Sequence, residues 1–254
     1  MRIGLLGHGE IGKAVRTVYT VRAQLLGTEP NFCFLIKDLD RDDGLTGLDV
    51  LHVVIPFSDN FVSIVEKEII DSAAKMTIIH STVAVGTTSK IQDFLLGSEI
   101  VHSPCRGVHP KLYEGLMTFP KFVGGRHASA VHSAVEHMRS LGINAVECKN
   151  AETTELAKLL DTAYYGVCIA FHGEAARACE KFGADFHDVM TAFNSSYNDG
   201  YKKLGRTDVV RPVLTPPGSE IGGHCVVQNA ELLKTQFDST ALELILEYKK
   251  KSRQ

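Results

Sequence analysis

The chain has 254 residues, which suffices for one large or two smaller domains with a buried core. Hydrophobic residues make up 44% of the chain and charged residues 22%, an ordinary balance for a globular protein. The formal net charge of -3 provides no basic field, so neither nucleic acid nor an acidic membrane surface is an expected partner.

The apolar runs of the sequence are short and its cysteines are scattered. No stretch reaches the roughly 18 consecutive apolar residues that a membrane-spanning helix needs, and the N-terminus is a predicted core strand rather than a signal peptide. No CxxC pair occurs among the cysteines, which are Cys33, Cys105, Cys148, Cys168, Cys179 and Cys225. We therefore expect a reduced, cytoplasmic chain rather than a disulfide framework.

The first dozen residues carry a glycine motif in a strand–turn–helix context. An apolar run over 3–6 leads into Gly-x-Gly-x-x-Gly and then into a helix-like stretch over 13–25. Gly7 makes the turn, Gly9 lets the backbone approach a pyrophosphate, and Gly12 lets the helix pack against the strand. The pyrophosphate would lie on the free N–H groups at the helix start. The predicted cofactor-binding residues of this turn are Gly7, Gly9, Glu10, Ile11 and Gly12.

The second predicted strand, over 31–38, ends in an acidic residue, Asp38. An acid at this position accepts hydrogen bonds from the adenosine ribose hydroxyls and repels a 2′-phosphate, which favours NAD over NADP. Asp40 is the neighbouring candidate, whereas Arg41 would favour the phosphate of NADP. An ordinary turn role for these acids stays open.

Strands and helices alternate through the rest of the first half. Further strands are predicted at 49–56, 76–80, 99–103, 121–124 and, at the sheet edge, 144–148, with helices at 61–75 and 129–141. This alternation predicts an α/β fold with a mainly parallel, doubly wound Rossmann sheet. Ligands of such sheets bind at the carboxyl ends of the strands. The cofactor-binding candidates in these loops are Pro56, Ser81 and Thr82.

The pattern becomes entirely helical near residue 150. A long helix is predicted over 152–182, a second over 185–204, and two more over 226–235 and 239–251. We therefore expect a NAD-binding Rossmann domain over 1–150 and a smaller helical domain for substrate and dimerisation over 151–254. A helix as long as the first often forms a dimer seam, so a homodimer through 152–182 is expected.

Several separated stretches together resemble the UDP-glucose/GDP-mannose dehydrogenase family of nucleotide-sugar 6-dehydrogenases. They follow the family's order and are 81–87 (STVAVGT), 103–106 (SPCR), 123–125 (VGG), 155–159 (ELAKL) and 217–225 (PGSEIGGHC). The resemblance covers nearly the whole chain and stops before the family's C-terminal nucleotide-sugar-binding domain. We expect the binding energy of a nucleotide to be missing unless a partner supplies that domain.

The resemblance implies a chemistry and three catalytic residues. The family oxidises a primary alcohol twice with NAD; a cysteine captures the intermediate aldehyde as a thiohemiacetal, and water later hydrolyses a thioester. By motif position Cys225 is that cysteine, and a helix start just beyond it would favour a thiolate. Lys158 matches the lysine that stabilises oxyanion charge, and Thr82 the threonine that holds a water. A buried structural cysteine and a solvated helix lysine remain the alternatives.

Three positions depart from the family pattern. Cys105 stands where the family has a glutamate, Thr162 where it has an asparagine, and Asn229 where it has an aspartate. In the family these groups serve proton transfer and hydrolysis. One and two hydride transfers therefore both stay open.

These features predict a NAD-dependent dehydrogenase that acts on the CH–OH group of a sugar-like small molecule. One alternative is a two-electron β-hydroxyacid-type dehydrogenase in which the helix lysine is a general acid or base. The other is a catalytically inactive NAD-binding module. No metal site is expected, because the spacing of His102, Cys105, His109, His224 and Cys225 matches no zinc pattern. Surface positions are expected for the helix histidines His127, His132, His137 and His187.

Overall fold

The computed structural model describes residues 1–27, 31–218, 220–222 and 224–251. The chain divides into two compact units, Met1–Lys158 (unit 1) and Leu159–Gln254 (unit 2), and the division falls inside the long helix α6 (Ala151–Phe182). The domain boundary expected from the sequence, between residues 150 and 151, coincides instead with the start of this helix.

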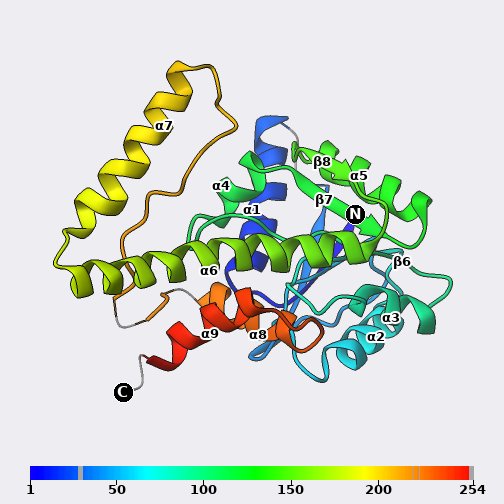
Figure 1. The fold of residues 1–254 in the computed structure, drawn as a ribbon. Coiled ribbons are helices and arrows are strands. Elements are labelled where there is room, and N and C mark those ends of the chain that lie inside the picture. The colour runs from blue at the N-terminus through cyan, green and yellow to red at the C-terminus, as the bar shows by residue number, and fades with distance from the viewer. Residues whose placement is uncertain (28–30, 219, 223, 252–254) are drawn as a thin grey trace. The chain divides into compact units, whose positions relative to one another are not determined.

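Among the described residues, unit 1 contains an eight-stranded sheet of order β3-β2-β1-β4-β5-β6-β7-β8 (Figure 1). Its strands are β1 (Arg2–Leu6), β2 (Cys33–Asp38), β3 (Arg41–Asp42), β4 (Val50–Val53), β5 (Met76–Ile79), β6 (Glu99–His102), β7 (Lys121–Gly125) and β8 (Ala145–Glu147). β2, β1, β4, β5 and β6 run parallel, whereas β3 is antiparallel to β2 and β7 is antiparallel to β6. The predicted edge strand is confirmed as β8.

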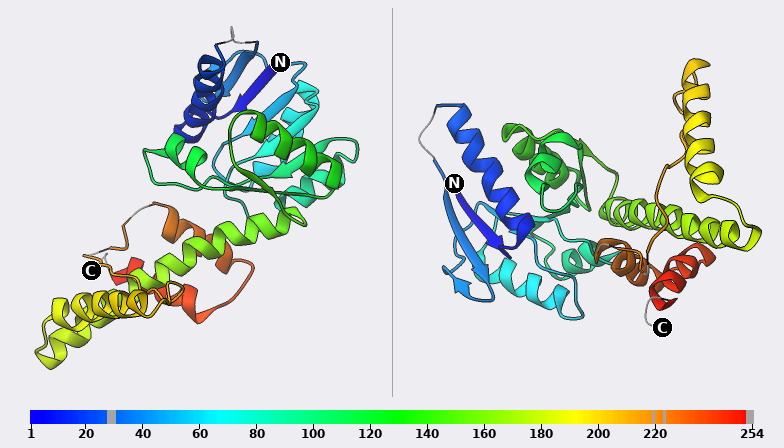
Figure 2. Two further views of the ribbon diagram at one scale, coloured as in Figure 1. Left: turned by 90° about the horizontal axis from the view of Figure 1, so that it is seen from above. Right: turned by 90° about the vertical axis from the view of Figure 1, so that its left-hand side faces the viewer.

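Helices cover both faces of this sheet (Figures 1 and 2). They are α1 (Glu10–Leu25), α2 (Phe61–Ser72), α3 (Thr87–Phe94), α4 (Leu112–Thr118) and α5 (Ala128–Ser140). One core cluster joins the sheet to α1, α4 and α5, and the other joins it to α2 and α3. Because side chains alternate along a strand, Val50 of β4 enters the first cluster while Leu51 and Val53 enter the second. The predicted doubly wound Rossmann fold is confirmed.

The glycine turn sets the distance between β1 and α1. Gly7 has a φ of +101°, in the region that favours glycine. A Cβ on Gly12 would lie 2.6 Å from the backbone oxygen of Gly7, whereas a Cβ on Gly9 would meet nothing within 4 Å. Gly7 and Gly12 are therefore required by the fold itself, and Gly9 leaves an open surface beside the helix start.

Unit 2 is helical, and beyond α6 it contains a π-helical turn at His187–Ala192, α7 (Phe193–Lys203), α8 (His224–Lys234) and α9 (Thr240–Lys251). The helix predicted over 185–204 is therefore partly π-helical. Gly166 of α6 lets the last two helices approach, because a Cβ there would lie 2.7 Å from Val226 and 2.9 Å from Ile245. In the described part of the chain, no helix combines the length and apolar character needed to cross a membrane.

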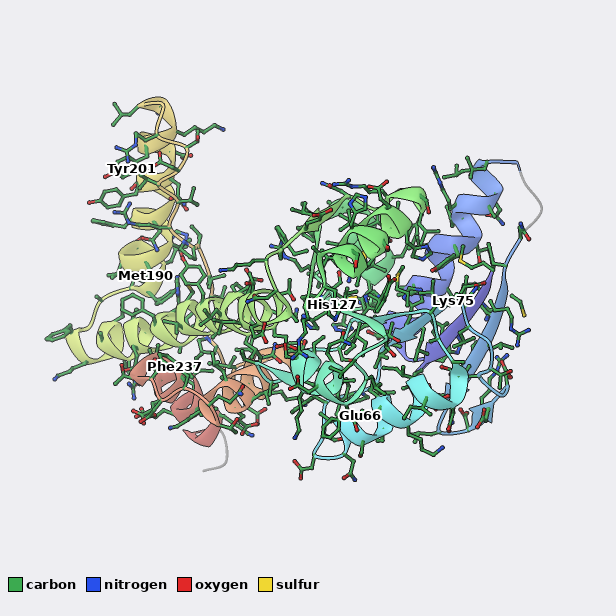
Figure 3. The ribbon with its side chains drawn as sticks, turned by 90° about the vertical axis from the view of Figure 1, so that its right-hand side faces the viewer. Glu66, Lys75, His127, Met190, Tyr201 and Phe237 are labelled. Atoms are coloured by element: carbon green, nitrogen blue, oxygen red, sulfur yellow. The ribbon has the colours of Figure 1, made fainter. Side chains whose placement is uncertain are left out.

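The segment after α7 folds back along that helix. Asn198 of α7 donates to the backbone oxygen of Arg211 at 2.9 Å and accepts the Arg211 N–H at 2.8 Å. The Arg211 guanidinium lies 3.9 Å from the centre of the Tyr197 ring, a cation–π contact. Figure 3 shows Met190 in the π-helical turn and Tyr201 in α7, which continues directly from that turn.

Replacement of Gly12 by alanine tests the close approach of α1 to β1. We expect Gly12→Ala to lower the free energy of unfolding by about 1–3 kcal/mol, because the new methyl group overlaps a backbone oxygen. Gly9→Ala is the matched control and should cost less than about 1 kcal/mol, since no atom opposes its Cβ. Urea denaturation measures both values, and equal losses in the two variants would contradict the packing role of Gly12.

Candidate active site

The Asp38 carboxylate lies beside the glycine turn. It accepts the N–H of His8 at 2.5 Å and the N–H of Leu39 at 2.6 Å. The bond from Leu39, followed by that from His8, lowers the pKa of Asp38, so this side chain is an anion. A pocket of about 410 Å³ opens here and is lined by His8, Lys13, Asp38, Asp40 and Arg41. The structure thus places Asp38 next to the glycine turn, where a ribose could meet it.

Arg41 also lines this pocket but is held by a neighbouring acid. Its guanidinium lies 2.7 Å from the Asp43 carboxylate, and Asp43 also accepts the N–H of Ile36 at 3.0 Å. The helix start on the other side of the pocket has no side-chain cap at Gly9. Its first N–H groups are therefore available to an anionic group such as a pyrophosphate. Glu10 of the same turn pairs with His109.

The loop after β5 carries two predicted cofactor-binding residues. Ser81 is buried, and its hydroxyl donates to the backbone oxygen of Ile55 at 2.6 Å, which ties this loop to the one after β4. Pro56, next along that second loop, is exposed, and Thr82 is partly exposed. The loops therefore meet at the carboxyl ends of adjacent parallel strands, as expected for a Rossmann sheet.

A buried histidine fixes the backbone at Ser81. His102 Nε2 lies 3.0 Å from the Ser81 backbone oxygen, and its Nδ1 lies 2.8 Å from the Thr154 hydroxyl. Burial lowers the pKa of His102 to about 3, so the imidazole is neutral. A neutral ring can donate from Nε2 to the oxygen and accept from the hydroxyl at Nδ1. His102 thereby joins β6, the loop after β5 and α6 within unit 1.

Glu155 of α6 holds the start of α3. Its carboxylate accepts the N–H of Gly86 at 2.6 Å, the N–H of Thr88 at 2.8 Å and the Thr88 hydroxyl at 2.6 Å. The side chain is buried, and burial raises its pKa. These bonds satisfy N–H groups at a helix start that has no cap of its own. The sequence placed Glu155 in the family's central helix without assigning it this role.

Lys158 follows Glu155 by three residues on α6 and is partly buried. The pKa values of His102, at the end of β6, and of Lys121, at the start of β7, are lowered mainly by burial. The positive charge of Lys158 is a smaller cause of both shifts. Within unit 1, Lys158 therefore lies near His102 and Lys121.

Lys121 at the start of β7 is a residue that the sequence did not single out. Its side chain is buried, and its Nζ lies close to the Ser103 backbone oxygen, 3.1 Å from that of Pro104 and 3.6 Å from Cys105 Sγ. Burial lowers the pKa of Lys121, an effect that Cys105 opposes. The structure thus sets an amine against the cysteine that stands where the family has a glutamate.

The surface position expected for His137 is wrong. His137 of α5 is partly buried, and its Nε2 lies 2.6 Å from the hydroxyl of Tyr19 on α1. Val135 and Met138 form part of the buried face of α5. Helical spacing identifies such a face, but it does not show that the side chain of the neighbouring His137 turns toward it. A tyrosine on another helix supplies the partner.

In unit 2, Cys225 is exposed and lies in the first turn of α8. Asn229, one turn later, is buried and donates to the Thr162 hydroxyl of α6 at 3.2 Å. Two of the three positions that depart from the family pattern are therefore in contact. Ser219 and Gly223 of the same motif, and the side chain of His224, lie outside the described residues.

The predicted site residues divide between the units. Thr82, Lys158 and the cofactor-binding candidates belong to unit 1, and Cys225 belongs to unit 2. Of the residues weighed as metal ligands, His102 is bonded to Thr154 and Ser81, and His109 pairs with Glu10.

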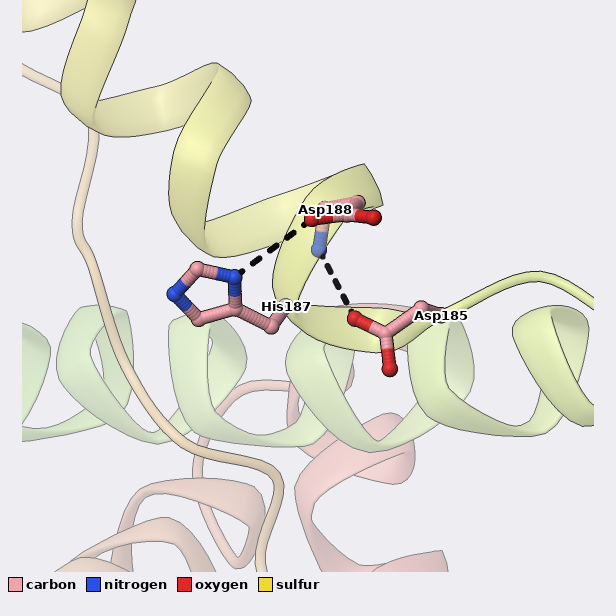
Figure 4. Close-up of side chains that lie close together, drawn as sticks. All are labelled: Asp185, His187 and Asp188. Atoms are coloured by element: carbon pink, nitrogen blue, oxygen red, sulfur yellow. Dashed lines mark hydrogen bonds and ion pairs between the residues drawn. The ribbon is translucent and has the colours of Figure 1, made fainter.

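A separate group of three exposed side chains, Asp185, His187 and Asp188, lies at the start of the π-helical turn (Figure 4). Asp185 accepts the N–H of Asp188 at 3.1 Å, and His187 Nδ1 lies 3.6 Å from the Asp188 carboxylate. Exposed acidic groups of this kind are common without an ion, so these contacts alone assign no ligand to the group.

The sheet, the glycine turn and the helical unit together define a Rossmann-type dehydrogenase fold. The structure of a UDP-D-ManNAc dehydrogenase from Pyrococcus horikoshii matches with a TM-score of 0.76 at 21% identity, covering 99% of this chain and 69% of that chain. A 3-hydroxyisobutyrate dehydrogenase from Mycobacterium tuberculosis matches with a TM-score of 0.68 at 18% identity, covering 98% of this chain and 92% of that one.

The sequence comparisons are narrower. Residues 152–251 match the UDP-glucose/GDP-mannose dehydrogenase family, central domain. A UDP-N-acetyl-D-mannosamine dehydrogenase of Pyrococcus horikoshii is 25% identical over 280 residues, covering 92% of this chain. The chain spans between 36% and 64% of the lengths of the curated relatives it matches. The resemblance to this family that the motifs indicated is confirmed.

Removal of the Glu155 carboxylate tests its role in holding α3. Glu155→Ala should lower the free energy of unfolding by about 2–4 kcal/mol, because two N–H groups and a buried hydroxyl lose a charged acceptor. Glu152→Ala is the matched control: Glu152 accepts one bond, from Ser89, and its loss should cost less than about 1 kcal/mol. Urea denaturation gives both numbers, and a Glu155 variant no weaker than the control would rule out the cap.

Proposed function

We propose that this chain is the catalytic part of an NAD-dependent oxidoreductase that oxidises an alcohol carbon of a sugar-like substrate. The observation that carries the proposal is the glycine turn with an ionised Asp38 at its rim, in a chain whose residues 152–251 match the central domain of nucleotide-sugar dehydrogenases. The matched relatives are named for amino-sugar nucleotides, so a sugar derivative is the first substrate class to test.

The residues of unit 1 fit NAD. The open side of Gly9 and the uncapped start of α1 suit a pyrophosphate. Asp38 can accept bonds from ribose hydroxyls with the lone pairs that His8 and Leu39 do not use. Arg41 is already paired with an acid, which supports NAD over NADP. When bound, NAD would accept the hydride from the alcohol carbon.

Three side chains would act on the substrate, at its oxygen and at its reacting carbon. The Lys158 ammonium would stabilise negative charge on the substrate oxygen, and the Thr82 hydroxyl would hold a water. The Cys225 thiolate would add to the carbonyl carbon of the aldehyde, forming a C–S bond while the oxygen takes a proton. The bond between Asn229 and Thr162 supports this assignment within unit 2, because it sets α8, one turn after Cys225, against α6.

A second candidate is a two-electron dehydrogenase of small β-hydroxy acids. The likeness to 3-hydroxyisobutyrate dehydrogenase favours it, because that protein is matched over 92% of its length. In this reaction Lys158 is the general acid or base and no cysteine is needed. The neutral pair of Asn229 and Thr162 also suits a single hydride transfer, since neither of these two positions carries a carboxylate for hydrolysis.

A catalytically inactive NAD-binding module is the third candidate, supported by the departures at Cys105, Thr162 and Asn229.

A cytoplasmic location and a homodimer are part of the proposal. Exposed aromatic side chains along α6, Tyr164, Tyr165 and Phe171, support a contact with a second copy.

Calorimetric titration with NAD and NADP tests Asp38. The unaltered protein should bind NAD more tightly, and Asp38→Ala should weaken NAD binding about tenfold, the effect of roughly 1.4 kcal/mol. Asp40→Ala is the control and should change the affinity less than about twofold, because Asp38 stays at the turn. A clear preference of the unaltered protein for NADP would reject the assignment.

Alkylation and product counting test Cys225. Iodoacetamide should modify Cys225 faster than Cys33, a control cysteine that is also exposed, and NAD should change the rate. With a UDP-sugar substrate, Cys225→Ala should stop after one NADH per substrate consumed, and Lys158→Met should lower kcat about 100-fold or more. A Cys225→Ala enzyme with full activity on a small hydroxy acid would select the second candidate instead.

A further inference from the structure

A row of polar side chains lies buried where apolar core is expected. Strand alternation puts His52 on the same face as Val50, and Lys121 on the same face as Val123, within the cluster that contacts α1 and α5. His52 and Lys121 are 3% and 2% exposed, and His80, after β5, is 4% exposed. Burial of such groups is unfavourable unless each finds partners, so the row calls for an explanation.

The members of this row are hydrogen-bonded in one continuous series. Lys121 Nζ lies 2.9 Å from His80 Nδ1, which also lies 3.1 Å from the Ser103 backbone oxygen, and His80 Nε2 lies 2.9 Å from His52 Nδ1. His52 Nε2 lies 2.8 Å from the Tyr19 hydroxyl, which lies 2.6 Å from His137 Nε2. Every step is of hydrogen-bond length, and the series crosses from β7 to α5.

From this geometry we propose that Lys121, His80, His52, Tyr19 and His137 form a proton relay between Cys105, at the carboxyl ends of the strands, and the outer face of α5. The relay rests on the proposed function only for the source of the proton, which alcohol oxidation releases. Its protein groups can be followed without any substrate.

The relay has two complete hydrogen-bond arrangements. In the first, the Lys121 ammonium donates to the Ser103 backbone oxygen and to His80 Nδ1, His80 and His52 donate from Nε2 to the next group, and Tyr19 donates to His137 Nε2. In the second, every proton has moved one step: Lys121 is a neutral amine, His80 and His52 carry their protons on Nδ1, and His137 is protonated on Nε2. One proton has moved from Lys121 to His137, and no bond other than N–H and O–H has changed.

The surroundings favour neutral carriers between the two ends. Burial, aided by charge on His137 and Lys121, sets the pKa of His52 well below its ordinary value, and burial with Lys121 does the same for His80. Burial raises the pKa of Tyr19, so the phenol does not ionise. These three groups can therefore pass a proton on but do not retain a charge. The titratable groups that face the Lys121 end are Cys105, His102 and Lys158.

The two ends suit entry and exit of a proton. Register places β7 antiparallel to β6 with His102 opposite Gly124, so Lys121 extends past the strand end to Cys105. Burial lowers the pKa of Lys121, which eases loss of its proton. His137 is partly exposed, and burial lowers its pKa, so a proton that reaches it is readily released. A cavity of about 20 Å³ touches Tyr19 and the first three relay groups.

Nitrogen-15 NMR of histidine-labelled protein tests the relay without substrate. In the unaltered protein His52 and His80 should change from the Nε2–H to the Nδ1–H tautomer together, in one step, as the pH rises. Lys121→Met removes the donor and should hold both rings in the Nδ1–H form at every pH. The relay would be overturned if the tautomers of His52 and His80 changed independently of each other. It would also be overturned if Lys121→Met left both tautomers as they are in the unaltered protein.

Turnover gives a second test once a substrate is found. Tyr19→Phe keeps the ring but breaks the series, so kcat should fall about tenfold or more with KM unchanged and a larger solvent deuterium isotope effect. His137→Ala should lose similar activity, and added imidazole should restore it. Tyr113→Phe, in the same core cluster, is the control and should behave as the unaltered protein.

The outcomes separate the relay from the proposed function. Normal kcat in Tyr19→Phe, or a His137→Ala defect that imidazole does not relieve, would reject the relay while the dehydrogenase proposal stands. Coupled tautomers in a protein that oxidises no substrate would support the relay and reject the proposed function.

Discussion

The direction of the strands is the constraint on which the rest of this structure depends. Parallel strands present their carboxyl ends at one edge of a sheet, so segments distant in sequence deliver their polar residues to the same place. β1 contributes the glycine turn, β2 contributes Asp38, and the loops after β5 and β6 contribute Ser81 and Cys105. The antiparallel β7 adds its first residue, Lys121, to that edge, because its chain starts where the parallel strands end.

Two buried polar side chains near this edge, Glu155 and His102, are fully hydrogen-bonded. An unpaired buried amide or hydroxyl costs about 1–3 kcal/mol, and an unpaired charge costs more. Glu155 meets this condition with three donors from one loop and helix start, and His102 meets it with an oxygen and a hydroxyl. These bonds hold α6 against the loop that carries Thr82, and they fix the stretch of α6 that carries Lys158.

The departures from the family pattern lie in two separate pairs. Cys105 contacts Lys121 in unit 1, and Asn229 contacts Thr162 in unit 2. In each pair the residue that replaces a carboxylate now has a partner of neutral or basic character. Both Cys105 and Asn229 lack the acidic group of the family pattern, so proton transfer is the part of the chemistry that this chain's own residues must explain.

The sequence by itself determined the glycine turn, the alternation of strands and helices, the long helix α6 and the family motifs, because periodicity and spacing encode these features locally. It missed α3 and α4, and the start of α3 has no side-chain cap of its own but is bonded by Glu155, 67 residues away from Thr88. Only the tertiary structure decided that Lys121 is buried, that His137 is partly buried and that Cys105 has an amine beside it. The register of an antiparallel strand and contacts between separate helices set those neighbours, and no local pattern contains them.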